Sequence, residues 1–419
     1  TTGFDIKSIA SAASLSARPS LTITESAALL TDEELVTEIN TASDLETFAE
    51  QVSGGNDYAG KTVTLNNDID LSEIYNKDGE SWEPIGGYDP TAGEDRPFAG
   101  TFEGNNHSVS GLYIKDGGSC LGLFGSASGS IKDLSVSGEI DGSSIIGGIA
   151  GWSSGSIENC SADVDITAQR EAGGIVGTLS YGTVSGCSNG GDIEAGDKET
   201  FAGGIAGHNI GGVISDCENT GTVANGLNGF RNKIGGIAGY LDGGEIINSQ
   251  NTGAVQSYAE RSTYVADETQ NYVGGIVGYS ARGVISDAIN SGDIYNAVDF
   301  AGGIAGYLKN GDEVTDCYNS GAVSGRSYVG GIAGSSYSAI SNCQNDGDVT
   351  AADKYAGGIV GYLSSGDIKD SYSSGNVAGA SFYGDIFGYN SMGTVTFTEP
   401  ETEFKAEYVD GKAVVTAPE

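Results

Sequence analysis

Short apolar runs alternate with turn residues along most of the chain. Pairs of Gly, Asn, Asp and Ser separate one run from the next, which is the composition of tight turns. Three kinds of run recur, exemplified by residues 328–334, 212–217 and 292–295. None has a 3.6-residue period long enough for a helix. The pattern therefore predicts many short β-strands joined by turns.

A pentapeptide, Gly-Gly-Ile-(Ala/Val)-Gly, marks the period of this pattern. Degenerate copies begin at Leu121 and Gly384. Self-similarity of this kind indicates one small structural unit stacked many times. Three strands per turn of about 27 residues predict an all-β fold, a single three-faced parallel β-solenoid (β-helix) of ten or eleven coils, right-handed by the rule for parallel crossovers. The eight intact copies, 26 to 39 residues apart, begin at Gly147, Gly173, Gly203, Gly235, Gly274, Gly302, Gly330 and Gly357.

Alignment of the units places equivalent side chains in columns, which a solenoid converts into ladders spaced about 4.8 Å apart. The Ile column is expected to point inward, and its flanking glycines to mark a tight bend or a close approach of backbones. One column is expected to adopt left-handed backbone at turns and to bond its stacked copies side chain to side chain. It contains Asn189, Asn219, Asn251, Asn290, Asn319 and Asn345.

The cysteines are expected to be buried free thiols. We assign all six to one column in which Ser and Ala also occur, with Cys187 and Cys217 inward on adjacent coils. Parallel Cβ directions along a ladder disfavour a disulfide. The absence of a C-x-x-C pair disfavours a metal site.

The pattern divides the chain into four segments. Residues 1–42 form an N-terminal extension with strand-like pieces and are a candidate donor strand. Residues 43–120 hold a capping helix and irregular initial coils, 121–393 hold the repeats, and 394–419 form a C-terminal strand or hairpin cap.

The short N-terminal capping helix is expected near residues 43–52. A capping box is expected to open it, from Ser43 to Glu46. Its apolar face should carry Leu45, Phe48, Ala49 and Val52.

The charge of the chain limits its partners. With 57 acidic and 19 basic residues the net charge is −38, which repels nucleic acid and anionic lipid. No cofactor is expected, although Asp-rich turns leave loosely bound calcium as an alternative to a solvated acidic coat. No stretch approaches 18 apolar residues, so membrane insertion is not expected. The Thr/Ser/Gly/Asn-rich composition and the start without Met predict an exported, extracellular protein.

Part of the chain resembles a known family. Five stretches resemble the start of a GLUG-motif array, and the pentapeptides resemble its body, over residues 43–390. Such arrays occur in bacterial surface adhesins and beside the catalytic part of IgA1-specific metallopeptidases, whose His-Glu-x-x-His motif this chain lacks. The resemblance implies surface display and adhesion, without active-site residues. The five stretches are 44–49, 65–72, 82–86, 98–105 and 121–125.

Catalytic chemistry has few candidates. His107 and His208 have no Ser or Cys partner at a recognisable spacing. A column of Asp and Asn residues contains one pair of acids on adjacent coils, Asp287 and Asp316, which leaves a polysaccharide lyase or glycoside hydrolase as the alternative function. Such a column more often faces turns and solvent. Near-identical coils also argue against an active site, so we predict a protein that is not an enzyme.

Two aromatic columns flank the pentapeptide. They can be structural ladders or a stripe that binds sugar or protein, and the sequence leaves both interpretations open. The preceding column contains Phe201, Tyr272, Phe300, Tyr328, Tyr355 and Phe382, interrupted by Lys233. The following column contains Trp152, Tyr240, Tyr279, Tyr307, Tyr362 and Tyr389.

Two insertions lengthen consecutive units, at residues 224–233 and 256–272. Both leave the same edge of the stack, where insertions of a repeat array commonly form a binding face; neutral loop drift is the alternative. We predict an exported bacterial cell-surface structural or adhesive protein, with assembly into filaments by β-strand addition as one form of that function. Its partners would be copies of itself, a host or cell-surface protein, or a glycan. The candidate contact residues are Phe230, Arg231, Lys233, Tyr258, Arg261 and Tyr264.

Overall fold

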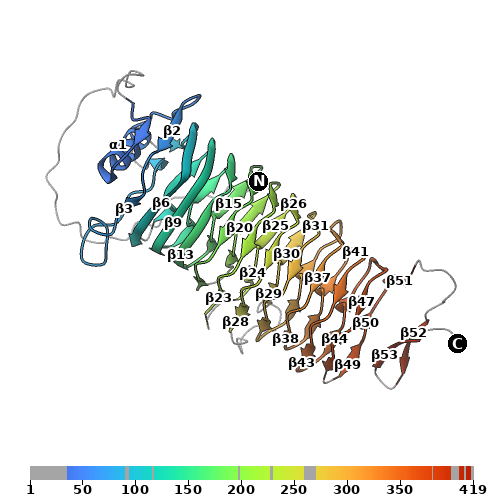
Figure 1. The fold of residues 1–419 in the computed structure, drawn as a ribbon. Helices are drawn as coiled ribbons and strands as arrows, with labels where there is room; N and C mark the ends of the chain where they lie inside the picture. The colour runs from blue at the N-terminus through green and yellow to red at the C-terminus, as the bar shows by residue number, and fades with distance from the viewer. Residues whose placement is uncertain are drawn as a thin grey trace, which may run out of the picture.

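The computed structural model is an elongated stack of coils with helix α1 (Ala42–Ser53) at its N-terminal end (Figure 1). The hairpin of β52 (Lys405–Val409) and β53 (Lys412–Thr416) lies at the opposite end. The structure describes residues 35–89, 94–115, 118–196, 199–226, 230–258, 270–379, 381–397, 405–409 and 412–416.

Each coil contributes to three parallel sheets, which confirms the predicted three-faced β-solenoid. One coil runs through β19 (Phe201–Gly203), β20 (Ala206–Ile210), β21 (Val213–Ser215), β22 (Glu218–Asn219) and β23 (Val223–Asn225). Every strand pairs in register with its equivalent in the next coil. The stack has about 12 turns, slightly more than expected, because irregular strands near the N-terminus also join it. Its right-handed sense stays a prediction.

Two of the sheets carry the residues around the pentapeptide. The 12-stranded sheet contains β52 and β53 together with β7 (Ser119–Leu121), β10 (Ser144–Gly147), β14 (Glu171–Gly173), β19, β24 (Lys233–Gly235), β29 (Tyr272–Gly274), β34 (Phe300–Gly302), β39 (Tyr328–Gly330), β44 (Tyr355–Gly357) and β49 (Phe382–Gly384). The 10-stranded sheet contains β8 (Phe124–Ala127), β11 (Ala150–Ser153), β15 (Val176–Ser180), β20, β25 (Ala238–Asp242), β30 (Val277–Ala281), β35 (Ala305–Leu308), β40 (Ala333–Ser336), β45 (Val360–Leu363) and β50 (Phe387–Asn390).

The third sheet has 29 strands in the described residues, because up to three short strands of each coil belong to it. It begins with β1 (Glu38–Ile39), β2 (Thr62–Leu65), β3 (Ile69–Asp70), β6 (Thr101–Lys115), β9 (Ser130–Asp141), β12 (Ser156–Glu158) and β13 (Ser161–Ala168). It continues through β16 (Thr183–Ser185), β17 (Ser188–Asn189), β18 (Ile193–Ala195), β21, β22, β23, β26 (Glu245–Ile247), β27 (Gln250–Asn251), β28 (Val255–Ser257), β31 (Val284–Ser286), β32 (Ile289–Asn290) and β33 (Ile294–Asn296). It ends with β36 (Glu313–Thr315), β37 (Tyr318–Asn319), β38 (Val323–Gly325), β41 (Ala339–Ser341), β42 (Gln344–Asn345), β43 (Val349–Ala351), β46 (Asp367–Lys369), β47 (Tyr372–Ser373), β48 (Val377–Gly379) and β51 (Thr394–Thr396). A separate antiparallel pair joins β4 (Gly87–Asp89) to β5 (Glu94–Arg96).

The pentapeptide places its Ile in the core, as predicted: Ile175, Ile205 and the equivalent residues are fully buried. Its first two glycines are required on opposite sides of the bend. A Cβ on Gly173 would lie 2.1 Å from the carbonyl oxygen of Val176, within the same bend. A Cβ on Gly174 would lie 2.2 Å from the side chain of Asn189 across the core. The sharp bend and the narrow core thus exclude any side chain at either position.

The asparagine column forms a buried ladder, as predicted, but its backbone is not left-handed. From Asn189 to Asn319, each Asn Nδ2 donates to the Oδ1 of the next Asn at 2.7–2.9 Å, and also to the backbone carbonyl two residues further on. Asn345, the last of the column, donates to Ser373 instead. The expectation of left-handed backbone was wrong for this column, because extended strands β17, β22 and their equivalents hold these residues. The left-handed turn lies three residues earlier in each coil, at Gly186 and Asp216 for example.

The cysteine column is confirmed for five of the six residues. Cys160, Cys187, Cys217, Cys317 and Cys343 are free and at most 2% exposed. The assignment of Cys120 to that column was wrong, since it lies in β7 of the 12-stranded sheet and is only partly buried.

Helix α1 buries the predicted face of Leu45, Phe48, Ala49 and Val52 over the N-terminal coils. The capping box differs from the prediction. Thr41 is the N-cap: its Oγ1 accepts from the Asp44 amide at 3.2 Å, and the Asp44 carboxylate accepts from the Thr41 amide at 3.0 Å. Both residues of the capping box, Thr41 and Asp44, thus lie two positions before the predicted pair, Ser43 and Glu46. Ser43 lies inside the helix.

The two ends differ in what the structure describes. Strand β1 lies within the predicted N-terminal extension and pairs with β2, while residues 1–34 lie outside the described residues. The C-terminal strands form a hairpin, and β53 pairs in parallel with β49. A C-terminal hairpin was one of the two expected forms of that segment.

Candidate functional site

The outer surface is concave where the 12-stranded and 10-stranded sheets meet. In one coil, Tyr272 projects from β29 and Tyr279 from β30, seven residues apart, and both are partly exposed. Their ring centroids are 5.1 Å apart. Outward side chains on two successive strands converge only if the outer faces of those strands turn toward each other. The pentapeptide bend therefore folds the surface into a groove.

This groove brings the two aromatic columns together. Phe300 and Tyr307 meet at 5.6 Å, and Tyr355 and Tyr362 at 5.8 Å, in the same manner as Tyr272 and Tyr279. The sequence presents these columns as separate stripes before and after the pentapeptide. The bend makes them the two walls of one groove, which we call the aromatic groove.

Within each wall the rings stack along the solenoid axis. Tyr279 and Tyr307 are 5.0 Å apart with 3° between their planes, and Phe300 and Tyr328 are 4.6 Å apart with 11° between theirs. Each such pair adds about 0.5–1.5 kcal/mol beyond area burial. The predicted structural ladder is therefore present. Because stacked neighbours cover the ring faces, the groove exposes mainly ring edges and tyrosine hydroxyls.

Lys233 occupies the position of an aromatic residue in one wall, between Phe201 and Tyr272 in the ladder register. Its Nζ lies 4.1 Å from the ring centroid of Phe201, 3.8 Å from that of Tyr240 and 5.1 Å from that of Tyr279. The ammonium is thus enclosed by aromatic rings, an arrangement that cation–π attraction favours. Burial lowers the pKa of Lys233 to about 8.

A cavity of about 450 Å³ opens beside this lysine. Arg231 lies on its rim and forms an ion pair with Glu199 at 3.1 Å. The cavity lies where the ends of both insertions meet the aromatic groove, with Arg231 from the shorter insertion and Gln270 from the longer. It is lined by Glu199, Phe201, Arg231, Lys233, Tyr240, Gln270, Tyr272 and Tyr279.

His208 belongs to the opposite wall of the groove, in register with Tyr240. Its ring stacks on Tyr240 at 4.7 Å, with 8° between the planes, and meets Phe201 edge to face at 5.2 Å. Burial lowers the pKa of His208, so the ring is neutral at pH 7. The ring extends the aromatic ladder.

The structure brings only part of the predicted contact set together. Arg231 and Lys233 line the cavity, and the carbonyl of Phe230 accepts a hydrogen bond from the Glu199 amide at 2.9 Å. Tyr258 lies apart, on the outer face of the 29-stranded sheet, with its ring 5.7 Å from that of Tyr295. Arg261 and Tyr264 lie outside the described residues.

Phe201, Tyr240 and Tyr279 also line this cavity, although the sequence did not group them with the insertion residues. The signal was available in the constant spacing of seven residues between the two aromatic columns. This spacing predicts a shared site only if the outer surface is known to be concave at the pentapeptide bend.

The acidic pair considered for catalysis occupies turns. Asp287 and Asp316 have φ of 53° and 54°, and both are exposed. The Asp316 carboxylate accepts a hydrogen bond from Thr315 of its own turn at 3.0 Å. A left-handed backbone at a tight turn favours Asn, Asp and Gly, which explains this column without chemistry.

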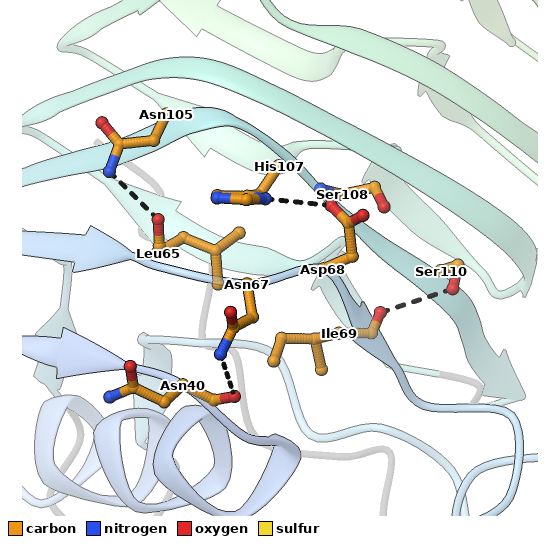
Figure 2. A network of polar contacts seen from close by, with 9 residues as sticks. All are labelled: Asn40, Leu65, Asn67, Asp68, Ile69, Asn105, His107, Ser108 and Ser110. Carbon is orange, nitrogen blue, oxygen red and sulfur yellow. Dashed lines mark hydrogen bonds and ion pairs between the residues drawn. The ribbon is translucent and has the colours of Figure 1, made fainter.

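His107 belongs to a polar network in the initial coils (Figure 2). Its Nδ1 lies 3.2 Å from Asp68, whose carboxylate also accepts from the Ser108 amide at 2.9 Å. Asn105 and Ser110 add bonds from the same strand, β6, to the carbonyls of Leu65 and Ile69. The network holds the irregular chain around β3 against β6. Backbone and histidine hydrogen bonds lower the pKa of Asp68.

Metal-ligand clusters and membrane-spanning helices are both absent from the described part of the chain. No group of three or more His, Cys, Asp and Glu side chains there could hold a metal ion. No helix there is long and apolar enough to cross a membrane.

Comparison with known proteins supports the resemblance seen in the repeats. The family model described as the GLUG motif matches residues 142–167, 325–350 and 352–378. Halomucin from Haloquadratum walsbyi is 33% identical over 87 residues, which are 19% of this chain and 1% of Halomucin. The match thus spans a very small part of that protein.

A solved structure from Bacteroides ovatus, described as a candidate immunoglobulin A1 protease, aligns with 69% of this chain and 76% of its own. The TM-score is 0.45 and the sequence identity 18%.

Proposed function

We propose that this protein is a non-catalytic, cell-surface binding scaffold that contacts extended glycan chains through the aromatic groove. One observation carries the proposal: two outward aromatic columns, separate in sequence, converge at the bend into a single groove along successive coils. A surface built only for stacking would need one column of rings. Two facing columns create a linear contact surface of half-buried rings and hydroxyls.

The composition of the groove favours a sugar chain over a peptide. A peptide that adds to a sheet needs an open strand edge, whereas β29, β34 and their neighbours are paired on both sides. Tyrosine hydroxyls recur along the groove at the coil spacing of about 4.8 Å. They can exchange hydrogen bonds with sugar hydroxyls, while the ring edges contact C–H groups.

Surface location is supported by the GLUG-motif matches and by the acidic composition rich in Thr, Ser, Gly and Asn. Adhesion follows from the groove, because a rigid solenoid can hold many weak contacts in line. A linear array of such contacts gains affinity without any single strong site.

The experiment compares glycan binding by two variants. Tyr279→Ala with Tyr307→Ala removes a stacked pair from the groove, whereas Tyr295→Ala removes an exposed ring from the 29-stranded sheet. In affinity electrophoresis through neutral polysaccharides, the groove variant is expected to bind about tenfold more weakly, and the control to bind as the parent does. Equal retardation of the parent and groove variant would contradict the proposal.

The enzyme alternative is a polysaccharide lyase or glycoside hydrolase. It is disfavoured by the exposed turn positions of Asp287 and Asp316. Release of reducing ends or unsaturated sugars by the parent chain, lost on Asp287→Asn or Asp316→Asn, would replace the binding proposal with this one.

Filament assembly is a separate proposal. A strand from residues 1–34 would add to a neighbouring copy, and its removal would leave β1, Thr41 and the helix cap intact. Deletion of residues 1–34 should then abolish higher assemblies in sedimentation velocity. A monodisperse monomer of the full chain at high concentration would rule this out.

A further inference from the structure

Lys233 has charge but no anionic partner. Among the residues that the structure describes, no carboxylate lies within ion-pair distance of its ammonium; its neighbours are the rings of Phe201, Tyr240 and Tyr279. Cation–π contacts offset part of the charge, but ring faces are weaker acceptors than oxygen atoms, and among the described residues the ammonium donates to no oxygen atom. The ammonium therefore has N–H groups to offer to a ligand in the adjoining cavity.

The acidic groups nearest to Lys233 are engaged elsewhere. Glu199 pairs with Arg231 at 3.1 Å, and Asp242 pairs with Arg282 at 2.6 Å. The third, Glu171, accepts a hydrogen bond from Thr178 at 2.5 Å. Because these three carboxylates are bonded to other residues, the Lys233 ammonium can bind an anionic ligand on the aromatic side of the cavity.

We propose that this cavity binds the carboxylate of an acidic sugar unit carried by a predominantly neutral glycan that lies in the aromatic groove. The inference rests on the proposed glycan-binding function. The carboxylate would accept a hydrogen bond from the Lys233 ammonium. Arg231 on the rim would be a second donor to the ligand while it stays paired with Glu199. The sugar ring would contact Tyr240, Tyr272 and Tyr279, which line the same cavity.

The net charge of the protein limits how many carboxylates a bound ligand can carry. A net charge of −38 repels any polymer that carries a carboxylate on every unit. From Tyr272 to the C-terminal end of the groove the described wall positions are uncharged, as at Phe300, Tyr307 and Tyr328. A neutral chain with an isolated acid group satisfies both conditions. A strongly acidic peptide does not, because it meets the same repulsion.

The test uses two ligands that differ in one group. A xylo-oligosaccharide bearing a single glucuronic acid is compared with its carboxyl-reduced form by isothermal titration calorimetry. The parent chain should prefer the acid by about tenfold, as expected for one charge-assisted contact. Lys233→Met should bring the ratio near one, while Lys354→Met, whose ammonium lies 5.6 Å from the ring of Tyr328, should keep it.

The pH dependence provides a second readout on the unmodified protein. The charged groups facing Lys233 are Glu171 on β14, Glu199 before β19, Asp242 on β25 and Arg231 before β24. His208 is neutral at pH 7 and above. Tyr240, Tyr272 and Tyr279 keep their protons, because burial raises their pKa values. The preference should therefore fade as Lys233 loses its proton near pH 8.

Each outcome has one meaning. Equal affinity for both ligands, or a preference unchanged by Lys233→Met, overturns the acidic-sugar inference while glycan binding stands. Binding of a poly-Glu peptide as tight as that of the acidic sugar also overturns it. Binding of neither oligosaccharide, nor of any neutral polysaccharide, removes the proposed function as well. A preference that persists above pH 9.5 overturns the role of Lys233 specifically.

Discussion

Asn219 donates its side-chain amide to Asn251 of the next coil at 2.8 Å, and Asn251 repeats the bond to Asn290 at the same distance. Both bonds are fully buried. The ladder thereby satisfies, from coil to coil, polar groups that water cannot reach.

Replacement of Asn251 by Ala should destabilise the stack. The change removes two ladder bonds and the bond to the Gly253 carbonyl. It deprives the Asn219 Nδ2 and the Asn290 Oδ1 of their ladder partner. A loss of about 3 kcal/mol is expected, since unsatisfied buried groups cost about 1–3 kcal/mol each. Thermal unfolding followed by circular dichroism measures it. Asn376→Ala, which removes one exposed side-chain bond to Asp348, is the control and should change little.

Gly174→Ala should be at least as damaging. The added Cβ would approach the Asn189 side chain to 2.2 Å and the Gly204 carbonyl oxygen to 2.3 Å, so neighbouring coils must separate. Overpacking of this kind costs about 1–3 kcal/mol or more. Gly190→Ala is the matched control, because its Cβ would meet nothing closer than 3.5 Å. Similar melting temperatures for the two variants would show that the core is wider than the structure indicates.

Asp312 should make stability depend on pH. Burial raises its pKa from 3.8 to about 6, so the folded chain holds this proton more tightly than the unfolded chain. The contribution is fully present below pH 4 and is lost as the pH rises through 6, with a magnitude on the order of 3 kcal/mol.

Asp312→Asn should remove this part of the pH dependence. The difference in unfolding free energy between variant and parent should change between pH 4 and pH 7, whereas exposed Glu313→Gln should leave it constant. Parallel profiles of the parent and Asp312→Asn would contradict the assignment. The Asn oxygen can still accept from Ser280 and the Gly283 amide, as the carboxylate does.

One cysteine should react in the native protein. Cys120 is partly exposed, while the five thiols of the column are at most 2% exposed. Maleimide labelling read by mass spectrometry should add one group to the folded chain and six after unfolding in guanidinium. Burial raises the pKa of Cys120, so its labelling should accelerate at alkaline pH. Native labelling that survives Cys120→Ser would show that the column opens.

Features that recur in every repeat could be predicted from the sequence alone. A column such as Ile205 and Ile237 is apolar in every unit, so its inward direction follows from periodicity alone. The bonding of Asn219 to its stacked copies followed for the same reason. Periodicity could not predict which column of residues occupies the left-handed turn of each coil. Asp216 and Asn219 belong to residue types equally common in turns, and only the backbone distinguishes them.

Features that occur once were harder to predict. Thr41 and Ser43 both suit an N-cap, and the choice depends on where the strand before the helix ends. The contact of Lys233 with Tyr240 depends on the angle between two sheets, which no single column encodes. Arg231 and Lys233 were selected for their charge in an insertion, but the rings that enclose the lysine came from the regular repeat.

The buried asparagine ladder ends before the stack of coils does, so the two ends of the solenoid differ. Asn345 donates to Ser373, and among the described residues no further asparagine follows in that column. At the opposite end, Phe48 of α1 packs against Phe98 and Phe102. In a linear array each coil is held only by its neighbours. Amide hydrogen exchange should therefore be fastest in the last coils and slow toward α1, so that the chain frays from one side and the coil bearing Lys233 outlasts those near β50.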